Sequence, residues 1–181
     1  MVANHNSHAD GVTLMTSVPV DRLAITYPVA AEDYFGKSKL SAFLSWFLIN
    51  LLLIPRKRDD KNPKRDPIFI LDSYLKNGKS LIFFPEGSRG KAGKIQTFKK
   101  GLGHLMKENM NIPIIPVYLE GIGRVLPKGN KIMLPGITKI YFGNPIFLEN
   151  ESVEEIVEKA ENAVHDLKNR CDNNNSSNLR E

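Results

Sequence analysis

Apolar residues along this chain alternate between helical spacing, with a period of about 3.6 residues, and short continuous runs. FILDSYLKNG, residues 69–78, has helical spacing and a glycine at its end, which predicts a helix that stops at Gly78. SLIFFPEG then predicts a buried strand, and FKKGLGHLMKENM returns to helical spacing. Two further buried strands are predicted for IPIIPVYL and KIYFGNPIFL. This alternation predicts a single α/β domain in which a mixed, largely parallel sheet is flanked by helices.

The C-terminal part of the chain changes from an amphipathic to a polar pattern. SVEEIVEKAENAVHDL, residues 152–167, places its apolar side chains on one face and predicts a closing amphipathic helix. Ser152 and Glu155 fit a capping box at its start. The Asn and Ser content of residues 171–181 predicts a disordered tail, which leaves residues 1–170 as the domain.

The most apolar run of the chain is AFLSWFLINLLLI, residues 42–54. Ser45 and Asn50 interrupt it, and it is shorter than the ~20 residues that a membrane-spanning helix requires. We expect a helix that ends at Pro55 and lies either in the core or at a bilayer surface. Before it, RLAITYPVA at residues 22–30 predicts a strand.

Charge and cysteine usage narrow the function classes. The net charge of +5 predicts attraction to an anionic partner, whether nucleic acid, phospholipid headgroups or a phosphorylated substrate. Much of the positive charge lies in RKRDDKNPKR, residues 56–65, and in a second basic stretch over residues 89–100. The first stretch lacks interleaved aromatic residues and any recognition motif, so we expect no nucleic-acid partner. The single Cys171 excludes an intrachain disulfide and suits a reducing cytosol.

Two histidines and an aspartate lie close together in the first residues of the chain. His5, His8 and Asp10 are compatible with a metal cluster, with a base and its orienting carboxylate, or with a polar loop that caps a helix. Ser7 and Asp10 fit a capping box for a short helix over GVTLMTSV, which places His5 in the preceding turn. The remaining histidines fall on separate predicted helices without ligand spacing, so we expect no metal and no cofactor.

The turn after the SLIFFPEG strand is a second candidate site. FFPEGSRG, residues 83–90, brings a carboxylate, two glycines, a hydroxyl and an arginine to the end of a buried strand, where α/β proteins usually bind ligands. Arg89 offers a planar fork for a bidentate phosphate contact. The same residues are compatible with a surface turn held by an ion pair between Glu86 and Arg89.

These segments together resemble the phospholipid/glycerol acyltransferase family, whose best-known members are the 1-acylglycerol-3-phosphate acyltransferases. The family's first motif, a histidine and an aspartate separated by four residues, stands here as NHNSHAD. Its third motif, commonly FPEGTRS, is FPEGSRG here, followed by FKKG. The fourth is IPIIPVYLEG, and the second and weakest aligns on NLLLIPRK, giving Arg56. Members usually carry a substantial segment before the first motif. In this sequence the first motif begins at Asn4.

The resemblance implies a glycerol-3-phosphate acyltransferase-like fold and a role for each motif. A neutral imidazole suits removal of a hydroxyl proton near pH 7, which makes His5 the candidate base and Asp10 the carboxylate that orients it. His8 stands at a variable position of the motif. The phosphate-binding residues that the resemblance implies are Arg56, Glu86, Gly87, Ser88, Arg89 and Lys100, with Lys99 as the alternative lysine.

The expected activity is transfer of a fatty acyl group from acyl-CoA or acyl-carrier protein to the free hydroxyl of a lysophospholipid. The leading acceptor is 1-acylglycerol-3-phosphate, which would give phosphatidic acid in phospholipid biosynthesis. The expected location is peripheral, on the cytoplasmic face of a membrane. One alternative keeps the chemistry and changes the acceptor to glycerol 3-phosphate or another lysolipid. The other is a non-catalytic module that binds anionic lipid through its basic stretches.

Overall fold

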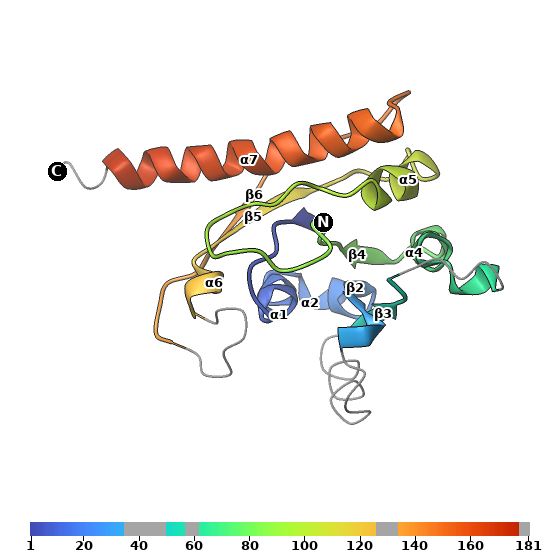
Figure 1. Cartoon of the computed structure of the whole chain (residues 1–181), viewed down its shortest axis with the longest axis horizontal. Coiled ribbons are helices and arrows are strands. Elements are labelled where there is room, and N and C mark those ends of the chain that lie inside the picture. The colour runs from blue at the N-terminus through green and yellow to red at the C-terminus, as the bar shows by residue number, and fades with distance from the viewer. Residues whose placement is uncertain (35–49, 57–61, 126–133, 178–181) are drawn as a thin grey trace. The chain divides into compact units, whose positions relative to one another are not determined.

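The computed structural model describes residues 1–34, 50–56, 62–125 and 134–177. The chain forms two compact units (Figure 1): one combines residues 1–10 with the chain from residue 84 onward, and the other holds residues 11–83. Each unit contains a small sheet with helices packed on it, so the predicted α/β class with mixed parallel sheets is confirmed. The prediction of one domain over residues 1–170 stays a prediction.

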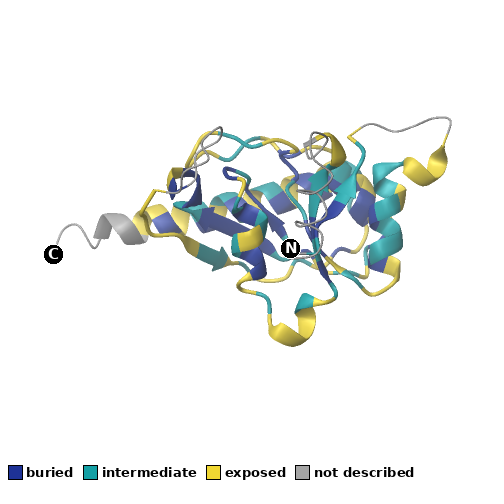
Figure 2. Cartoon of the chain, turned by 90° about the horizontal axis from the view of Figure 1, so that it is seen from below, coloured by how far each residue is buried: buried dark blue, intermediate teal, exposed yellow. Residues whose placement is uncertain are grey.

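The first unit is built around strand β5 (Pro116–Glu120). Its sheet has the order β1-β5-β6, in which β1 (Val2–Ala3) runs parallel to β5 and β6 (Lys139–Phe142) runs antiparallel to it. Residues 116–119 are buried. Figure 2 colours the buried residues of the chain dark blue. The second half of the apolar run IPIIPVYL therefore belongs to the central strand, whereas residues 112–115 of the run lie outside it.

Helix α7 (Val153–Ser177) packs on β5, helix α5 (Gly101–Lys107) packs on α7, and α6 (Ile122–Val125) follows β5. The predicted capping box at α7 is confirmed, because Ser152 N–H donates to Glu155 Oε2 at 2.7 Å and Glu155 N–H donates to Ser152 Oγ at 3.3 Å. The apolar face of α7 is buried between Ile156 and Cys171, at Ala160 and Val164 among others. The amphipathic pattern therefore marks the packed face.

Helix α7 is longer than the sequence predicts. Disorder was expected from residue 171, but the helix continues to Ser177, which corrects the prediction for residues 171–177. The physical reason is Cys171, which extends the buried face of α7, is 1% exposed, and donates from Sγ to Tyr141 Oη on β6 at 3.3 Å. Residues 178–181 lie outside the described residues.

The second unit has a parallel sheet of order β3-β2-β4, formed by β2 (Thr26–Ala31), β3 (Leu52–Ile54) and β4 (Ser80–Ile82). Its helices are α1 (Asp10–Met15), α2 (Val20–Leu23) and α4 (Pro67–Lys76), with single 3-10 turns at Glu32–Tyr34 and Pro63–Arg65. Helix α4 begins with a capping carboxylate at Asp66 and ends before Gly78, whose φ of 70° provides the predicted glycine stop.

The predicted helix over residues 42–54 is wrong in its last three residues. Leu52–Ile54 form strand β3, paired in parallel with Val29–Ala31, and residues 42–49 lie outside the described residues. Asn50 explains the change, because its φ of 52° suits a turn and its Nδ2 donates to the Leu23 carbonyl at 2.9 Å. Within the described parts of the chain, no helix has both the length and the apolar character needed to cross a bilayer.

The close approach of α5 to α7 generates a stability prediction. A Cβ at Gly103 would lie 2.3 Å from the Val153 carbonyl oxygen, so Gly103→Ala should lower the free energy of unfolding by about 1–3 kcal/mol. Gly101→Ala in the same helix is the matched control, since a Cβ there has no neighbour within 4 Å. Urea unfolding of the three chains tests this, and equal midpoints for the two variants would contradict the packing described.

Candidate active site

His5 lies two residues after the end of the short strand β1, and Asn4 determines where the strand ends. The pairing of β1 with β5 covers Val2 and Ala3. At the next position the buried Asn4 side chain takes over this pairing: Leu119 N–H donates to Asn4 Oδ1 at 2.7 Å, and Asn4 Nδ2 donates to the Leu119 carbonyl at 3.1 Å. Since the side chain makes these bonds, the main chain can turn away from the sheet at His5.

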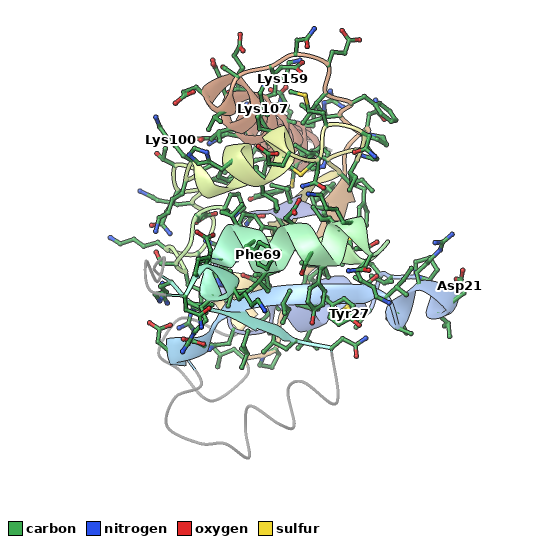
Figure 3. All side chains as sticks on the ribbon, turned by 90° about the vertical axis from the view of Figure 1, so that its right-hand side faces the viewer. Asp21, Tyr27, Phe69, Lys100, Lys107 and Lys159 are labelled. Atoms are coloured by element: carbon green, nitrogen blue, oxygen red, sulfur yellow. The ribbon has the colours of Figure 1, made fainter. Side chains whose placement is uncertain are left out.

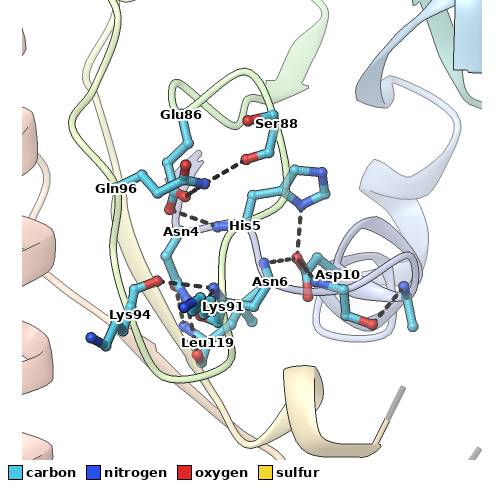
Figure 4. Close-up of polar contacts among 12 residues, drawn as sticks. Asn4, His5, Asn6, Asp10, Glu86, Ser88, Lys91, Lys94, Gln96 and Leu119 are labelled. Atoms are coloured by element: carbon cyan, nitrogen blue, oxygen red, sulfur yellow. Dashed lines mark hydrogen bonds and ion pairs between the residues drawn. The ribbon is translucent and has the colours of Figure 1, made fainter. Parts of the chain in front are cut away.

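The His5 imidazole is held by a buried carboxylate. His5 Nδ1 lies 2.7 Å from Asp10 Oδ2, and the same oxygen accepts the main-chain N–H groups of Asn6 at 2.7 Å and Ser7 at 2.8 Å (Figure 4). Because a carboxylate accepts, the proton lies on Nδ1 and the second ring nitrogen, Nε2, keeps a free lone pair. The geometry is that of a general base with its orienting group.

Asp10 also contributes to the start of helix α1. The predicted box of Ser7 and Asp10 is present in modified form, because Asp10 Oδ2 accepts from Ser7 N–H while Ser7 Oγ accepts from Ala9 N–H at 3.2 Å. Orientation of His5 and capping therefore share one oxygen of a fully buried side chain. Asp10 Oδ1 is buried and has no hydrogen-bond partner within the described residues.

The environment of the ring differs from that of the carboxylate. The His5 side chain is 22% exposed and Asp10 is 0% exposed, so a substrate can approach the base while the carboxylate stays shielded from water. One face of the ring stacks on Phe84, with centroids 4.4 Å apart and planes 21° from parallel. Stacking and the bond to Asp10 together limit rotation of the imidazole.

Glu86 supports His5 through the main chain of the histidine. It is only 2% exposed, its Oε1 accepts from His5 N–H at 2.9 Å, and its Oε2 accepts from Gln96 Nε2 at 3.0 Å. Burial raises the pKa of Glu86 to about 7, although both hydrogen bonds oppose that shift. The resemblance implied phosphate binding for Glu86, and that role stays a prediction; the described contacts make it a support for the base.

The rest of the FPEGSRG turn lies on the surface. Gly87 has φ of 69°, and a Cβ on it would lie 2.7 Å from Lys99 Nζ, so the Lys99 side chain crosses the turn there. Ser88 is exposed and Arg89 is half-buried. Burial, followed by the charges of Arg89 and His5, lowers the pKa of His8.

Two of the predicted phosphate ligands make contacts elsewhere. Lys100, labelled in Figure 3, is exposed. Its Nζ lies 2.6 Å from Glu154 Oε1 at the beginning of α7. Arg56 belongs to the second unit, where its Nε donates to the Asp33 carboxylate at 2.6 and 2.8 Å. The first unit thus brings together His5, Asp10, Glu86, Gly87 and Lys99.

Sequence reasoning did not identify four residues that hold the site together: Asn4, Asn6, Phe84 and Gln96. Asn6 Nδ2 donates to the Lys91 and Lys94 carbonyls at 2.8 and 2.9 Å, which ties the loop after the third motif to the first motif. Gln96 Nε2 donates to Glu86 and to the Ser88 carbonyl. The asparagines flank His5, which is a usable signal, whereas Gln96 stands in a polar stretch with no pattern.

Comparison with known proteins shows the family of this chain. The acyltransferase family matches residues 1–120, and the chain therefore belongs to this family. The chloroplastic 1-acyl-sn-glycerol-3-phosphate acyltransferase BAT2 of Brassica napus is 28% identical over 151 residues, which cover 81% of this chain and 40% of that protein. The 1-acyl-sn-glycerol-3-phosphate acyltransferase alpha of Mus musculus is 26% identical over 172 residues, which cover 92% of this chain and 56% of that protein. This chain spans about half the length of these relatives.

A solved structure shows the same fold. The crystal structure of the 1-acyl-sn-glycerophosphate (LPA) acyltransferase PlsC from Thermotoga maritima superposes with a TM-score of 0.62 at 24% sequence identity, covering 92% of this chain and 65% of that chain. The family resemblance and the fold predicted from the motifs are confirmed.

The raised pKa of Glu86 predicts a pH dependence of stability. The value is 4.5 in the unfolded reference and about 7 in the folded chain, so the folded chain binds more protons between these pH values. The contribution of Glu86 to the free energy of unfolding is therefore complete below about pH 4.5 and is lost as the pH rises through about 7. Over this range the wild type should lose about 1–3 kcal/mol more than Glu86→Gln.

Urea unfolding of both chains at a series of pH values measures this difference. The other titrating groups affect both chains alike, so the difference between the two curves isolates Glu86. Parallel curves between about pH 4.5 and 8 would show that Glu86 titrates as it does in the unfolded chain.

Proposed function

We propose that this chain is the catalytic part of an O-acyltransferase that transfers a fatty acyl group from a thioester to a lysophospholipid. The observation that carries the proposal is the 2.7 Å contact between His5 Nδ1 and the buried Asp10 carboxylate, in a chain of the acyltransferase family. A partly exposed imidazole, oriented by a carboxylate, suits removal of a proton from a substrate hydroxyl.

In the proposed reaction His5 Nε2 takes the hydroxyl proton as the acceptor oxygen attacks the thioester carbonyl carbon. Asp10 stabilises the imidazolium that forms. The carbon–sulfur bond then breaks, the new ester bond remains, and the thiol leaves with the proton returned by the imidazolium. The acceptor oxygen attacks the thioester directly, and His5 both takes and returns the proton. The proposed reaction therefore requires no covalent acyl-enzyme.

The proposed acceptor is 1-acylglycerol-3-phosphate, and the product is phosphatidic acid. The printed names of the Brassica napus and Mus musculus relatives support this acceptor. A phosphate also suits the basic side chains of Lys99 and Arg89 near the FPEGSRG turn. The proposed donor is acyl-CoA or acyl-carrier protein, since both present the acyl group as a thioester.

The proposed location is the cytoplasmic face of a membrane, with the chain bound peripherally. A lysophospholipid acceptor is delivered by a bilayer, and the basic residues 56–65 would favour anionic headgroups. Binding to vesicles with and without anionic lipid, at low and high salt, tests this part of the proposal.

Replacement of the base tests the reaction. His5→Ala should reduce thiol release from acyl-CoA, in the presence of 1-acylglycerol-3-phosphate and lipid vesicles, by roughly 10²-fold or more. Release should depend on the lysolipid in the wild type, and vesicle binding should not change in the variant. Lysolipid-dependent turnover that survives His5→Ala would refute the role of the base. A wild type that binds vesicles and releases no thiol from either donor would indicate a lipid-binding module.

The two neighbouring lysines provide a matched test of acceptor binding. Lys99→Ala should raise the KM for 1-acylglycerol-3-phosphate by about 10-fold, the order expected for loss of a charge-assisted hydrogen bond. Lys100→Ala should stay within about twofold of the wild type, because Lys100 pairs with Glu154. With monoacylglycerol, an acceptor without phosphate, the difference between the two variants should disappear. Equal effects of both substitutions would assign no special role to Lys99.

A further inference from the structure

Gln96 makes a pair of hydrogen bonds that link the third motif to the base. Its Nε2 donates to Glu86 Oε2 at 3.0 Å and to the Ser88 carbonyl at 2.9 Å. An amide nitrogen has two protons, so these bonds use its full donor capacity. The Ser88 carbonyl only accepts, which defines the orientation of the amide, because the reversed side chain would place the amide oxygen against this carbonyl oxygen.

The bond to Glu86 reaches His5 through a single side chain. Glu86 Oε1 accepts from His5 N–H at 2.9 Å, and Gly90 N–H donates to the His5 carbonyl at 2.8 Å. The turn over residues 86–90 therefore binds both the N–H and the carbonyl group of His5. Gln96 lies beside both of the residues that make these bonds, because it donates to Glu86 and lies against Gly90.

The absence of a side chain at Gly90 makes room for Gln96. A Cβ at Gly90 would lie 2.8 Å from Gln96 Nε2 and 3.2 Å from both Cγ and Cδ of Gln96. A methyl group there would push the flexible end of the Gln96 side chain away and weaken its two bonds. Gly90 thus offers a second and independent way to remove the same interaction.

We propose that Gln96 is a positioning residue for the base: through Glu86 and the turn over residues 86–90 it holds the His5 imidazole in its productive position between Phe84 and Asp10. This inference rests on the proposed function, in which His5 is the general base. Gln96 contacts neither reacting group, so its contribution is to orientation and not to substrate binding. Small displacements of a catalytic group reduce the rate of the chemical step.

The first experiment replaces Gln96 with leucine, which keeps the approximate size and removes both donors. Gln96→Leu should lower kcat by roughly 10-fold and leave the KM values for acyl-CoA and lysolipid within about twofold. Thr97→Ala, at the neighbouring exposed position, is the matched control and should keep the wild-type kcat. A merely structural role would reduce the folded fraction and would leave the kcat per folded molecule unchanged.

Gly90→Ala should reproduce the loss of kcat in Gln96→Leu, and the double variant should be no worse than either single variant, since all three remove one interaction. Independent, multiplying effects of the two substitutions would overturn the proposal. So would a Gly90→Ala chain with wild-type kcat. If Gln96→Leu fails to fold, Gly90→Ala still decides the question, because it keeps the glutamine.

A measurement without turnover separates this proposal from the proposed function. The Nδ1–H proton of His5, assigned by its loss in His5→Ala, should give a sharp downfield NMR resonance in the wild type and a shifted or broadened one in Gln96→Leu. The same line position and width in both chains, with equal kcat, would refute the role of Gln96. Suppose that the resonance differs between the wild type and Gln96→Leu, but that the wild type transfers no acyl group. The positioning role of Gln96 would then stand, and the acyltransferase proposal would fail.

Discussion

The site depends on the hydrogen bond between the His5 imidazole and a carboxylate that is buried away from water. An ionised carboxylate is expensive to bury unless donors replace its hydration. Asp10 meets this condition by accepting His5 and two main-chain N–H groups on one oxygen. These N–H groups belong to the residues that follow His5, so the bonds that keep the carboxylate in place also shape the turn that presents the histidine.

A second buried carboxylate, Glu86, is also stabilised by hydrogen-bond donors, but with a different arrangement. Glu86 divides its two oxygens between a main-chain donor at His5 and a side-chain donor at Gln96, and burial still raises its pKa to about 7. At Glu86 the desolvation caused by burial therefore outweighs the hydrogen bonds that the carboxylate accepts. The two carboxylates therefore hold one histidine from opposite sides, one through its ring and the other through its main chain.

Local sequence pattern was sufficient for the parts of this arrangement that depend on neighbours in the chain. The glycine stop of α4, the capping box of α7 and the placement of His5 before a short helix all rest on contacts within a few residues. The contact between His5 and Glu86 joins residues 81 positions apart, and no local pattern reports the partner. The family resemblance supplied the pairing of the two motifs, but it named Glu86 as a phosphate ligand and was silent on Gln96.

The difference between local and long-range contacts also explains the errors in the prediction of the fold. Residues 52–54 are apolar enough for a buried helix, and only their pairing with Val29–Ala31 makes them a strand. Cys171 stands among polar residues, and only its contact with Tyr141 shows that the closing helix continues past it. In both cases a long-range partner overrides the local preference.

The position of His5 itself depends on distant residues more than on its own segment. Strand β1 has two residues, and the chain from Asn4 to Ala9 has no regular structure. Its geometry comes from Leu119 on β5, from Glu86 and Gly90 in the third motif, and from the carbonyls of Lys91 and Lys94. A short irregular segment loses much conformational entropy when it is ordered, so many separate contacts are needed to hold it. This requirement explains why buried polar side chains such as Asn4, Asp10 and Glu86 hold the segment that carries the candidate base.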